Sequence, residues 1–479
     1  MRLLGGWPLD AWPWFPVRLL VLVGVVAAIL VSFHALLHKR DVGSTIGWIG
    51  LAWLSPLAGG LLYLTFGINR VHRRARRLRG RHGPAVRGGA GTHVFVLDHR
   101  LAALAQAATR ISGRAAEGGN AIALFRNGDA AYPAMLEAIA QARHSIALSS
   151  YILRDDAAGG QFIDALVAAH QRGVAVRVLI DGIGGGWFRS AAYRRLRRNG
   201  VPAARFLHAL RPWRMPVLNL RTHRKILVID GRLAFTGGMN IGAENVLAGH
   251  PPHPVRDTHF RFDGPVVDQL VAAFAEDWWF EMEQELTGEA WFPPPTPAGN
   301  AVARVVTSGP DQDIGKIEFL ILEAIACARH SIRLMTPYFL PAEREITALA
   351  LAQLRGVEVD ILVPERGDHP IMDSAMRAHV GPLLARGCRI WRNPPPFDHS
   401  KIMVVDGEWC LIGSANWDIR SLRLNFELNV EVYDKDLAAR LETLMESCRG
   451  RRLSIEDLDA RSLSARLRDA AARLLMPYL

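Results

Sequence analysis

The chain has 479 residues, of which 50% are hydrophobic and 22% are charged, and its formal net charge at pH 7 is +11. This length has room for two core-forming domains and a membrane anchor, and the basic balance favours an anionic partner, either a nucleic acid or an anionic lipid surface. The four cysteines show no C-x-x-C spacing. A disulfide framework or a cysteine metal site is therefore unsupported, and reduced, buried thiols are expected.

Two apolar segments near the N-terminus predict a membrane anchor. Leu19–Leu37 is apolar apart from a serine and a histidine, and as a helix it would extend about 30 Å, enough to cross a bilayer. No charged residue occurs between Asp41 and Arg70, so we expect a second span near Ile46–Ile68. The short link 38–44 would make the two spans a helical hairpin with both outer ends on one side. A cleavable signal peptide is the alternative for the first segment, but the second segment disfavours it.

A cluster of arginines follows these segments: Arg70, Arg73, Arg74, Arg76, Arg77, Arg79 and Arg81. Such clusters normally stay cytoplasmic and lie on anionic headgroups, so we expect the rest of the chain on that side. Lys39 and Arg40 in the link oppose this placement but are outnumbered. The cluster could also be a topology signal with no lipid function.

The remaining sequence contains two similar runs of alternating strand-like and helix-like segments. Ala142-Arg-His-Ser-Ile146 recurs as Ala328-Arg-His-Ser-Ile332, and Arg172-Gly-Val174 recurs as Arg355-Gly-Val357. Each run is expected to contain a helix, a strand, a helix, a strand, a helix and then the strand of a polar motif. Such alternation predicts an α/β sandwich with a largely parallel or mixed sheet.

The composition divides the chain into four parts. We expect a membrane anchor with two transmembrane helices, a basic linker with a short docking helix, and two α/β domains separated by a proline-rich stretch. The predicted boundaries are 1–69 for the anchor, 70–115 for the linker, 116–295 for the first domain and 296–479 for the second.

Each half carries the same sparse polar motif. The copies read His223-x-Lys225-x4-Asp230, then six residues and Gly237-Gly-x-Asn240, and His399-x-Lys401-x4-Asp406, then six residues and Gly413-Ser414-x-Asn416. The four apolar residues after each lysine predict a buried strand, from which the histidine and lysine leave on the same face. The glycine permits a tight turn, and the asparagine that follows offers an amide donor.

The two copies together supply what phosphodiester chemistry needs. One histidine can act as nucleophile while the other gives a proton to the leaving oxygen, although the sequence alone does not assign the roles. The lysines and asparagines can hold the non-bridging phosphate oxygens. We expect the two motif strands to meet at the interface between the halves, in one composite site. No metal is expected, because the lysines supply the positive charge and His250, His253 and His259 match no standard ligand spacing.

The doubled motif resembles that of the phospholipase D superfamily, and the chain more narrowly resembles bacterial cardiolipin synthases. The narrower features are the two N-terminal apolar segments, the stretch Trp417–Glu427 after the second motif, and Arg256-Asp257-Thr-His259 after the first. The likeness covers essentially the whole chain. It implies an α/β fold of two phospholipase D-like α/β/α sandwich halves in a pseudo-twofold arrangement, with an N-terminal transmembrane helical hairpin.

The resemblance also implies roles for individual residues. The candidate catalytic set is His223, Lys225, Asp230, His399, Lys401 and Asp406, and the candidate substrate-binding set is Asn240, Ser414 and Asn416. His223 is expected to be the nucleophile and His399 the general acid and then base. Asp257 and Glu427 are each expected to hydrogen-bond the imidazole of their own motif and to fix its tautomer. Within the catalytic set, Asp230 and Asp406 are expected to tie the motif strand to its turn.

The activity that the resemblance implies is a phosphatidyltransferase of the bacterial inner membrane, with cytoplasmic catalytic domains. One phosphatidylglycerol would give its phosphatidyl group to a histidine and release glycerol, and a second would attack to give cardiolipin. The expected partners are the membrane and its anionic phospholipids, with no cofactor and no nucleic acid, whereas protein partners cannot be predicted. The alternatives are a hydrolytic phospholipase D, a membrane-tethered nuclease and a non-catalytic scaffold.

The segment Phe206–Leu220 before the first motif mixes apolar and basic residues. Beside a membrane anchor it is a candidate for a lipid-facing rim, with Trp213 and Met215 at the interface.

Overall fold

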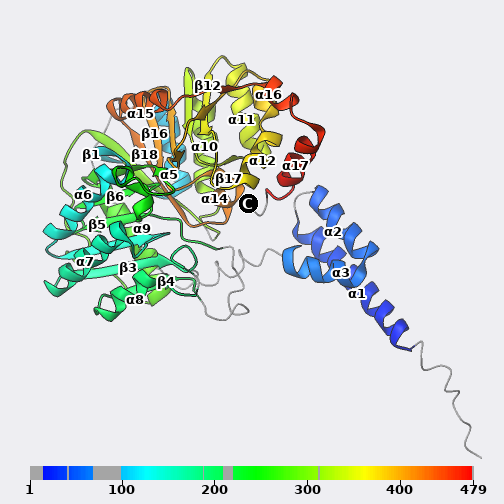
Figure 1. The fold of residues 1–479 in the computed structure, drawn as a ribbon, viewed down its shortest axis with the longest axis horizontal. Coiled ribbons are helices and arrows are strands. Elements are labelled where there is room, and N and C mark those ends of the chain that lie inside the picture. The colour runs from blue at the N-terminus through cyan, green and yellow to red at the C-terminus, as the bar shows by residue number, and fades with distance from the viewer. Residues whose placement is uncertain are drawn as a thin grey trace, which may run out of the picture. The chain divides into compact units, whose positions relative to one another are not determined.

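The computed structural model describes residues 15–39, 42–67, 99–186, 188–208, 220–310 and 313–476. These residues belong to two compact units, Met1–Arg74 and Ala75–Leu479, and each unit is described by itself (Figure 1). The whole arginine cluster and most of the candidate lipid-facing rim, including Trp213 and Met215, lie outside the described residues. The four predicted domain boundaries are not tested by this division and stay predictions.

The first unit contains the predicted membrane anchor. Its elements are the helices α1 (Phe15–His38), α2 (Val42–Leu54) and α3 (Pro56–Leu62) and the π-helical turn η2 (Tyr63–Gly67). Among the described residues, only α1 is long and apolar enough to cross a membrane. Most of its large apolar side chains are exposed, and a narrow stripe of Ala28, Val31 and Ala35 packs against the rest of the unit.

The predicted second span, Ile46–Ile68, is not one continuous helix. The chain breaks at Ser55, and Pro56 begins α3, because proline has no N–H to continue the hydrogen-bond ladder of α2. Gly24 of α1 lies close to Pro56, and the Tyr63 hydroxyl lies 2.7 Å from His34 Nδ1. Helix α3 therefore runs beside α1 in the same direction as α1. The predicted hairpin of two full spans is wrong in its second helix, because that segment is divided into α2 and α3.

The second unit begins with α5 (His99–Ser112), the predicted docking helix, which packs on α10 and β9. The first half then contains α6 (Asn127–Gln141), β2 (Ser145–Ser150), α7 (Ala157–Gln171), β3 (Ala175–Asp181), α8 (Ala191–Arg198), β4 (Ala203–Phe206) and the motif strand β5 (Ile226–Ile229). The second half contains α10 (Lys316–Cys327), β10 (Ser331–Met335), α11 (Glu343–Leu354), β12 (Glu358–Pro364), α12 (Pro370–His379), β13 (Arg389–Asn393) and the motif strand β15 (Ile402–Val405). The predicted order is confirmed in both halves, with one further strand, β4 or β13, before each motif.

The remaining elements complete one mixed sheet that runs through both halves (Figure 1). The first half adds β1 (Glu117–Arg126), β6 (Leu233–Gly237), β8 (Thr258–Asp263) and helix α9 (Val266–Met282), and the second adds β9 (Ala301–Ser308), β16 (Trp409–Gly413), β18 (Glu427–Tyr433), helix α15 (Lys435–Ser447) and β19 (Arg452–Leu453). Among the described residues the strand order is β19-β13-β12-β10-β15-β16-β18-β9-β1-β8-β6-β5-β2-β3-β4. Apart from β19, this order is symmetric about the antiparallel β1–β9 pair, as a pseudo-twofold arrangement requires.

The strands that join the halves are β1 and β9, so the expectation that the motif strands meet at the interface is wrong. Between β5 and β15 lie β6, β8, β1, β9, β18 and β16. Two shorter contacts also cross between the halves. Strand β7 (Val255–Arg256) pairs in parallel with β14 (Phe397–Asp398), and Thr222 forms an isolated bridge with Phe426. These contacts involve the segments just before each motif strand.

The motif strand β5 is buried on both faces, as its four apolar residues predicted. Leu227 and Ile229 belong to the core cluster formed with α6, α7, β2 and β3. Their neighbours Ile226 and Val228 are equally buried but lie outside that cluster, and α9, which contacts β5, covers this second face. The strand therefore lies in the middle of three layers, which holds the residues before it in place.

Each motif strand ends at an aspartate in the left-handed conformation, Asp230 at φ 51° and Asp406 at φ 52°. The Asp230 carboxylate accepts hydrogen bonds from the backbone N–H groups of residues 143–145 at 2.7–3.2 Å, and Asp406 does the same for residues 329–331. The repeated Ala-Arg-His-Ser-Ile segments supply these N–H groups. Both carboxylates thus lie at the end of the strand opposite to the histidine, which supports a structural role.

Replacing Asp230 or Asp406 by alanine should therefore lower stability more than it changes the chemistry. The substitution leaves three backbone N–H groups without their acceptor, and because these groups are partly exposed we expect a loss of about 1 kcal/mol per site. Asparagine keeps one acceptor oxygen and should cost less. Denaturant unfolding of the detergent-solubilised protein measures the effect. Unchanged stability together with lost turnover would instead place these carboxylates at the reaction.

Candidate active site

The motif histidines and lysines lie just before the motif strands, which begin one residue after each lysine. Here the structure differs from the expected strand that starts at the histidine. The His223 N–H donates to the carbonyl of Phe426 at 2.8 Å, and the Phe426 N–H donates to the carbonyl of Arg221 at 2.8 Å. In the other half of the site, the His399 N–H donates to the carbonyl of Arg256 at 2.7 Å. Each histidine is therefore fixed to a segment of the opposite half.

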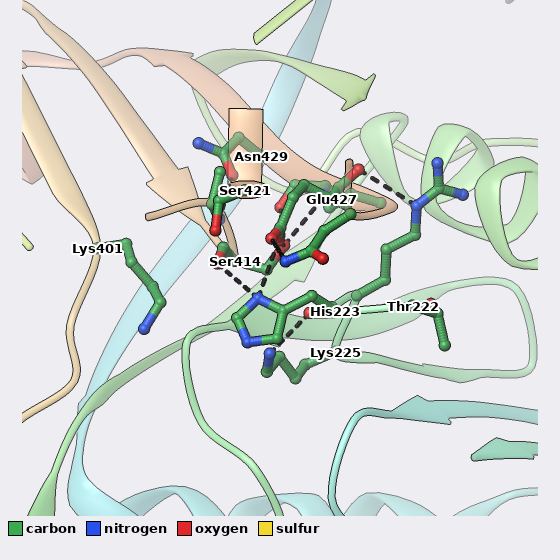
Figure 2. A network of polar contacts seen from close by, with 12 residues as sticks. Thr222, His223, Lys225, Lys401, Ser414, Ser421, Glu427 and Asn429 are labelled. Atoms are coloured by element: carbon green, nitrogen blue, oxygen red, sulfur yellow. Dashed lines mark hydrogen bonds and ion pairs between the residues drawn. The ribbon is translucent and has the colours of Figure 1, made fainter. Parts of the chain in front are cut away.

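The two residues that accept from the histidine N–H groups, Phe426 and Arg256, are each followed by an acidic residue, Glu427 and Asp257. His223 Nδ1 lies 3.0 Å from Glu427 Oε2, and His399 Nδ1 lies 2.8 Å from Asp257 Oδ2. The expectation that each carboxylate orients the histidine of its own motif is therefore wrong, because the pairs are crossed. With the proton on Nδ1, each ring donates to its carboxylate and keeps Nε2 for chemistry. Figure 2 shows the His223 ring with its contacts to Glu427 and Ser414.

The two imidazoles face one another across the site. Their ring centroids are 6.3 Å apart and the ring planes stand at 84°. Lys225 Nζ donates to the carbonyl of His223 at 2.7 Å, and Lys401 Nζ donates to the carbonyl of His399 at 2.5 Å. The crossed contacts thus gather two imidazoles and two ammonium groups, one of each from either half, at one place.

Both lysines are buried, and neither forms a salt bridge within the part of the chain that the structure describes. Burial lowers the pKa of Lys401 to about 8 and lowers the pKa of Lys225 well below its usual value, although Asp257 and Glu427 oppose the change. A buried ammonium group without a counterion is costly, and an anionic phosphate would remove that cost. The site is therefore electrostatically suited to a phosphate.

The two carboxylates have different surroundings. The Ser414 hydroxyl donates to Glu427 Oε2 at 2.5 Å, and the Asn425 amide donates to Glu427 Oε1 at 3.2 Å. At the place equivalent to Ser414 the first half has Gly238, where an added Cβ would lie 2.4 Å from Asp257 Oδ1. Only glycine permits this close approach. The Ser414 hydroxyl is engaged by Glu427, and Ser414 is not among the residues that line the cavity, so its substrate-binding role stays a prediction.

These surroundings make the two histidines electrostatically unequal. Burial lowers the pKa of His223 well below its usual value, and Lys225 lowers it further. Burial also lowers the pKa of His399, but there the hydrogen bond to Asp257 opposes the change. Burial would raise the pKa of Asp257, but the hydrogen bond from His399 and the charge of Lys401 outweigh it and lower this pKa. Burial raises the pKa of Glu427 to about 7. Asp257 is thus the firmer negative charge, and His399 the histidine better able to carry a proton.

Both histidines open into a cavity of about 960 Å³. Asn240 and Asn416, the remaining predicted substrate-binding residues, line it. Asn240 Oδ1 accepts a hydrogen bond from the Ile152 N–H at 3.3 Å, whereas the buried Asn416 Oδ1 has no hydrogen-bond partner among the described residues. An unsatisfied buried oxygen at a cavity wall is suited to a hydroxyl donor of a ligand.

The cavity also contains residues that the motifs did not predict. The Tyr151 ring packs edge-on against His223, with centroids 5.1 Å apart, and Tyr338 packs against His399 at 6.5 Å. Each tyrosine follows the strand of a repeated Ala-Arg-His-Ser-Ile segment, so a longer comparison of the two repeats would have found the pair. Arg221 and Arg420 also line the cavity.

No group of three or more histidine, cysteine, aspartate or glutamate side chains among the described residues is arranged to hold a metal ion. His259 is buried in β8, whereas His250 and His253 are exposed on the preceding loop. The expectation that the reaction needs no metal stays a prediction.

Comparisons with known proteins bear on the whole chain. The family described as "Cardiolipin synthase, PLD-like domain" matches residues 135–278 and 321–449, and the family "Phospholipase_D-nuclease N-terminal" matches residues 26–67. The "Cardiolipin synthase 1" of Bacillus anthracis is 31% identical over 97% of this chain and 95% of its own length. The "Cardiolipin synthase" of Geobacillus kaustophilus is 33% identical over 96% and 95%, and the "Cardiolipin synthase A" of Pseudomonas aeruginosa is 33% identical over 96% of both chains.

A solved structure adds to the evidence for the fold. The phosphatidylserine synthase of Haemophilus influenzae superposes with a TM-score of 0.58 and covers 75% of this chain and 95% of its own. Its sequence identity is 15%, so this likeness concerns the fold alone.

The crossed pairing predicts which histidine each carboxylate controls. Asp257→Asn and Glu427→Gln should each lower turnover by about 10²-fold, the scale of a positioned acid–base group, with folding intact. Because Asp257 raises the pKa of His399, Asp257→Asn should move the titration of His399 to lower pH and leave that of His223 in place. NMR of histidine-labelled protein, assigned with His223→Gln and His399→Gln, measures both rings. A shift confined to His223 in Asp257→Asn would contradict the crossed arrangement.

Proposed function

We propose a mechanism that proceeds from one premise: the chain belongs to the phospholipase D-like family of cardiolipin synthases. It is an enzyme, a membrane-associated phosphatidyltransferase that makes cardiolipin. Our proposal concerns the lipids it uses, the roles of the site residues and the side of the membrane on which it works. The observation that carries the mechanism is the facing pair of histidines with crossed carboxylates.

In the first step, Nε2 of His223 attacks the phosphorus of a donor phosphatidylglycerol. The bond between phosphorus and the headgroup glycerol oxygen breaks, and His399 gives that oxygen its Nε2 proton, so glycerol leaves as a neutral molecule. The phosphatidyl group stays on His223 as a phosphohistidine. Lys225 and Lys401 hold the non-bridging oxygens and the charge that grows on them.

In the second step, the terminal hydroxyl of an acceptor phosphatidylglycerol enters the place that glycerol left. His399, now neutral, takes the hydroxyl proton, the oxygen attacks phosphorus and the phosphorus–nitrogen bond breaks. Cardiolipin leaves, and His399 is again protonated. The balance is two phosphatidylglycerols giving one cardiolipin and one glycerol, with no oxidant, reductant or other reactant.

The inequality of the two histidines supports this assignment of roles. A nucleophile must be neutral, and the low pKa of His223 keeps it so. A general acid must hold a proton that it can give up. Burial lowers the pKa of His399 as well, but the hydrogen bond to the ionised Asp257 opposes this, so His399 is the better proton carrier of the two. The two rings line the same cavity with their centroids 6.3 Å apart, a placement that suits attack and proton transfer on one phosphate.

Product analysis tests this function. Purified enzyme in mixed micelles with labelled phosphatidylglycerol should form cardiolipin and glycerol in equal amounts, as followed by mass spectrometry. Phosphatidic acid as the main product would instead favour the hydrolytic alternative, in which water is the acceptor.

The histidine variants serve as matched controls for that reaction. His223→Ala and His399→Ala should both stop turnover, because each step needs both rings. Only His399→Ala should accumulate phosphorylated protein from a substrate with a good leaving group, since such a substrate needs no acid. An adduct mapped to His399 in His223→Ala would reverse the two roles.

We also propose that the catalytic halves lie on the cytoplasmic side of a bacterial inner membrane. Helix α3 runs alongside α1, and the Tyr63–His34 contact places the start of η2 near the C-terminal end of α1. Lys39 and Arg40 follow α1 directly, and the Arg70–Arg81 cluster follows η2 in the sequence. With one span in α1, these two basic stretches share a side, and the conflict between them that a two-span hairpin creates disappears.

Accessibility of the two chain ends tests this topology. A tag after Leu479 should be protected in intact cells, and a tag before Met1 should be reached by an impermeant reagent from outside, because α1 crosses once. Two protected ends would restore the two-span hairpin. Outside access to the C-terminal tag would contradict the cytoplasmic placement of the catalytic halves.

A further inference from the structure

The product of the reaction sets a requirement that the two motif lysines do not meet. Cardiolipin carries two phosphates joined by one glycerol, so at the transfer step the cavity must hold two phosphates at once. One is the reacting phosphate on the histidine, whose non-bridging oxygens Lys225 and Lys401 hold. The other belongs to the acceptor lipid and does not react. A hydrolase has no second phosphate to hold, so a site for it is specific to transfer.

Three arginines line the cavity, and they differ in their partners. Arg154 Nε lies 2.9 Å from Glu244 Oε1, so its charge is already compensated. Arg221 and Arg420, one from each half, form no salt bridge within the described residues. The Arg221 guanidinium donates to the carbonyl of Leu220 at 2.8 Å, and no hydrogen bond of the Arg420 guanidinium occurs among the described residues.

The backbone of both arginines is fixed to the segment that orients His223. The carbonyl of Arg221 accepts from the Phe426 N–H at 2.8 Å, and the carbonyl of Arg420 accepts from the N–H groups of Leu424 and Asn425 at 2.8 and 3.0 Å. The three residues that donate these hydrogen bonds, Leu424, Asn425 and Phe426, lie directly before Glu427. The side chains of the two arginines are half-buried, whereas their main chains are held with the catalytic groups.

The two guanidinium groups also lie within electrostatic range of each other and of Tyr151, whose ring packs on His223. Burial lowers the pKa of Arg221, Asp181 opposes this, and Arg420 adds to it. The Asp181 oxygens are engaged by the backbone N–H groups of Ile183, Gly184 and Thr222. Two like charges are thus held together at a cavity wall without a salt bridge, and guanidinium forks match phosphate oxygens.

We propose that Arg221 and Arg420 together bind the phosphate of the acceptor lipid, and so favour a phosphate-bearing alcohol over water at the transfer step. The inference rests on the function proposed above. Neither arginine belongs to the doubled motif. Because one comes from each half, the transfer step would require both halves for binding the acceptor as well as for the chemistry.

The experiment compares two reactions of the same full-length preparation in mixed micelles. The first is cardiolipin formation from phosphatidylglycerol. The second is exchange of labelled glycerol into phosphatidylglycerol, which reverses the first step and involves only one phosphate. The variants are Arg221→Gln, Arg420→Gln and the double variant, with Arg420→Lys as the charge-conserving form.

We expect the double variant to lose cardiolipin formation by about tenfold or more, the effect of removing charge-assisted hydrogen bonds. Glycerol exchange should change far less, the share of phosphatidic acid should rise, and Arg420→Lys should recover part of the cardiolipin. Saturation with acceptor lipid should need a higher surface concentration.

The matched control is Arg143→Gln with Arg329→Gln. These exposed arginines also come one from each half, but their backbone N–H groups bind Asp230 and Asp406 at the opposite end of the motif strands. The control removes the same charge and should leave both reactions unchanged.

Two outcomes would overturn the inference. Equal loss of both reactions would mean that the arginines act on the reacting phosphate or on folding, and unchanged cardiolipin formation would mean that they bind no acceptor. A wild-type enzyme that exchanges glycerol but makes no cardiolipin would instead refute the proposed function.

Discussion

The site depends on two backbone hydrogen bonds that cross between the halves. The His223 N–H donates to Phe426 and the His399 N–H donates to Arg256, and in each case the next residue along the chain is the carboxylate that orients that histidine. Neither half therefore contains a complete catalytic pair. The long strands β1 and β9 join the halves into one sheet, and this pairing is what brings the crossed segments within reach.

A nearly symmetric scaffold becomes chemically asymmetric through a few substitutions between the repeats. Where the second half has Ser414 and Glu427, the first has Gly238 and Asp257, and the shorter carboxylate approaches the glycine backbone closely. The pKa of Glu427 is raised to about 7, while that of Asp257 is lowered. Phosphoryl transfer through an enzyme-bound intermediate needs one neutral and one protonated imidazole, and this difference supplies the distinction that the repeat itself lacks.

Much of this architecture could be predicted from the sequence, because the repeat and the doubled motif keep chemistry at fixed spacing. The α/β halves and the convergence of His223 and His399 follow from that spacing. The crossing of Asp257 and Glu427 could not be predicted, since it depends on contacts between segments far apart in the chain. The break before α3 could have been predicted from Pro56 itself, but the second span was predicted from its apolar composition alone. Ser414 occupies a motif position, yet only the packing around Glu427 shows what its hydroxyl contacts.

The central claim is that one composite site transfers the phosphatidyl group in two in-line displacements, first to a histidine and then to the acceptor. The configuration at phosphorus tests this claim most directly. Phosphatidylglycerol made chiral at phosphorus with oxygen isotopes would be converted to cardiolipin and the configuration of the transferred phosphate determined. Two displacements predict overall retention. Inversion would mean that the acceptor attacks the donor lipid directly, and it would contradict the account.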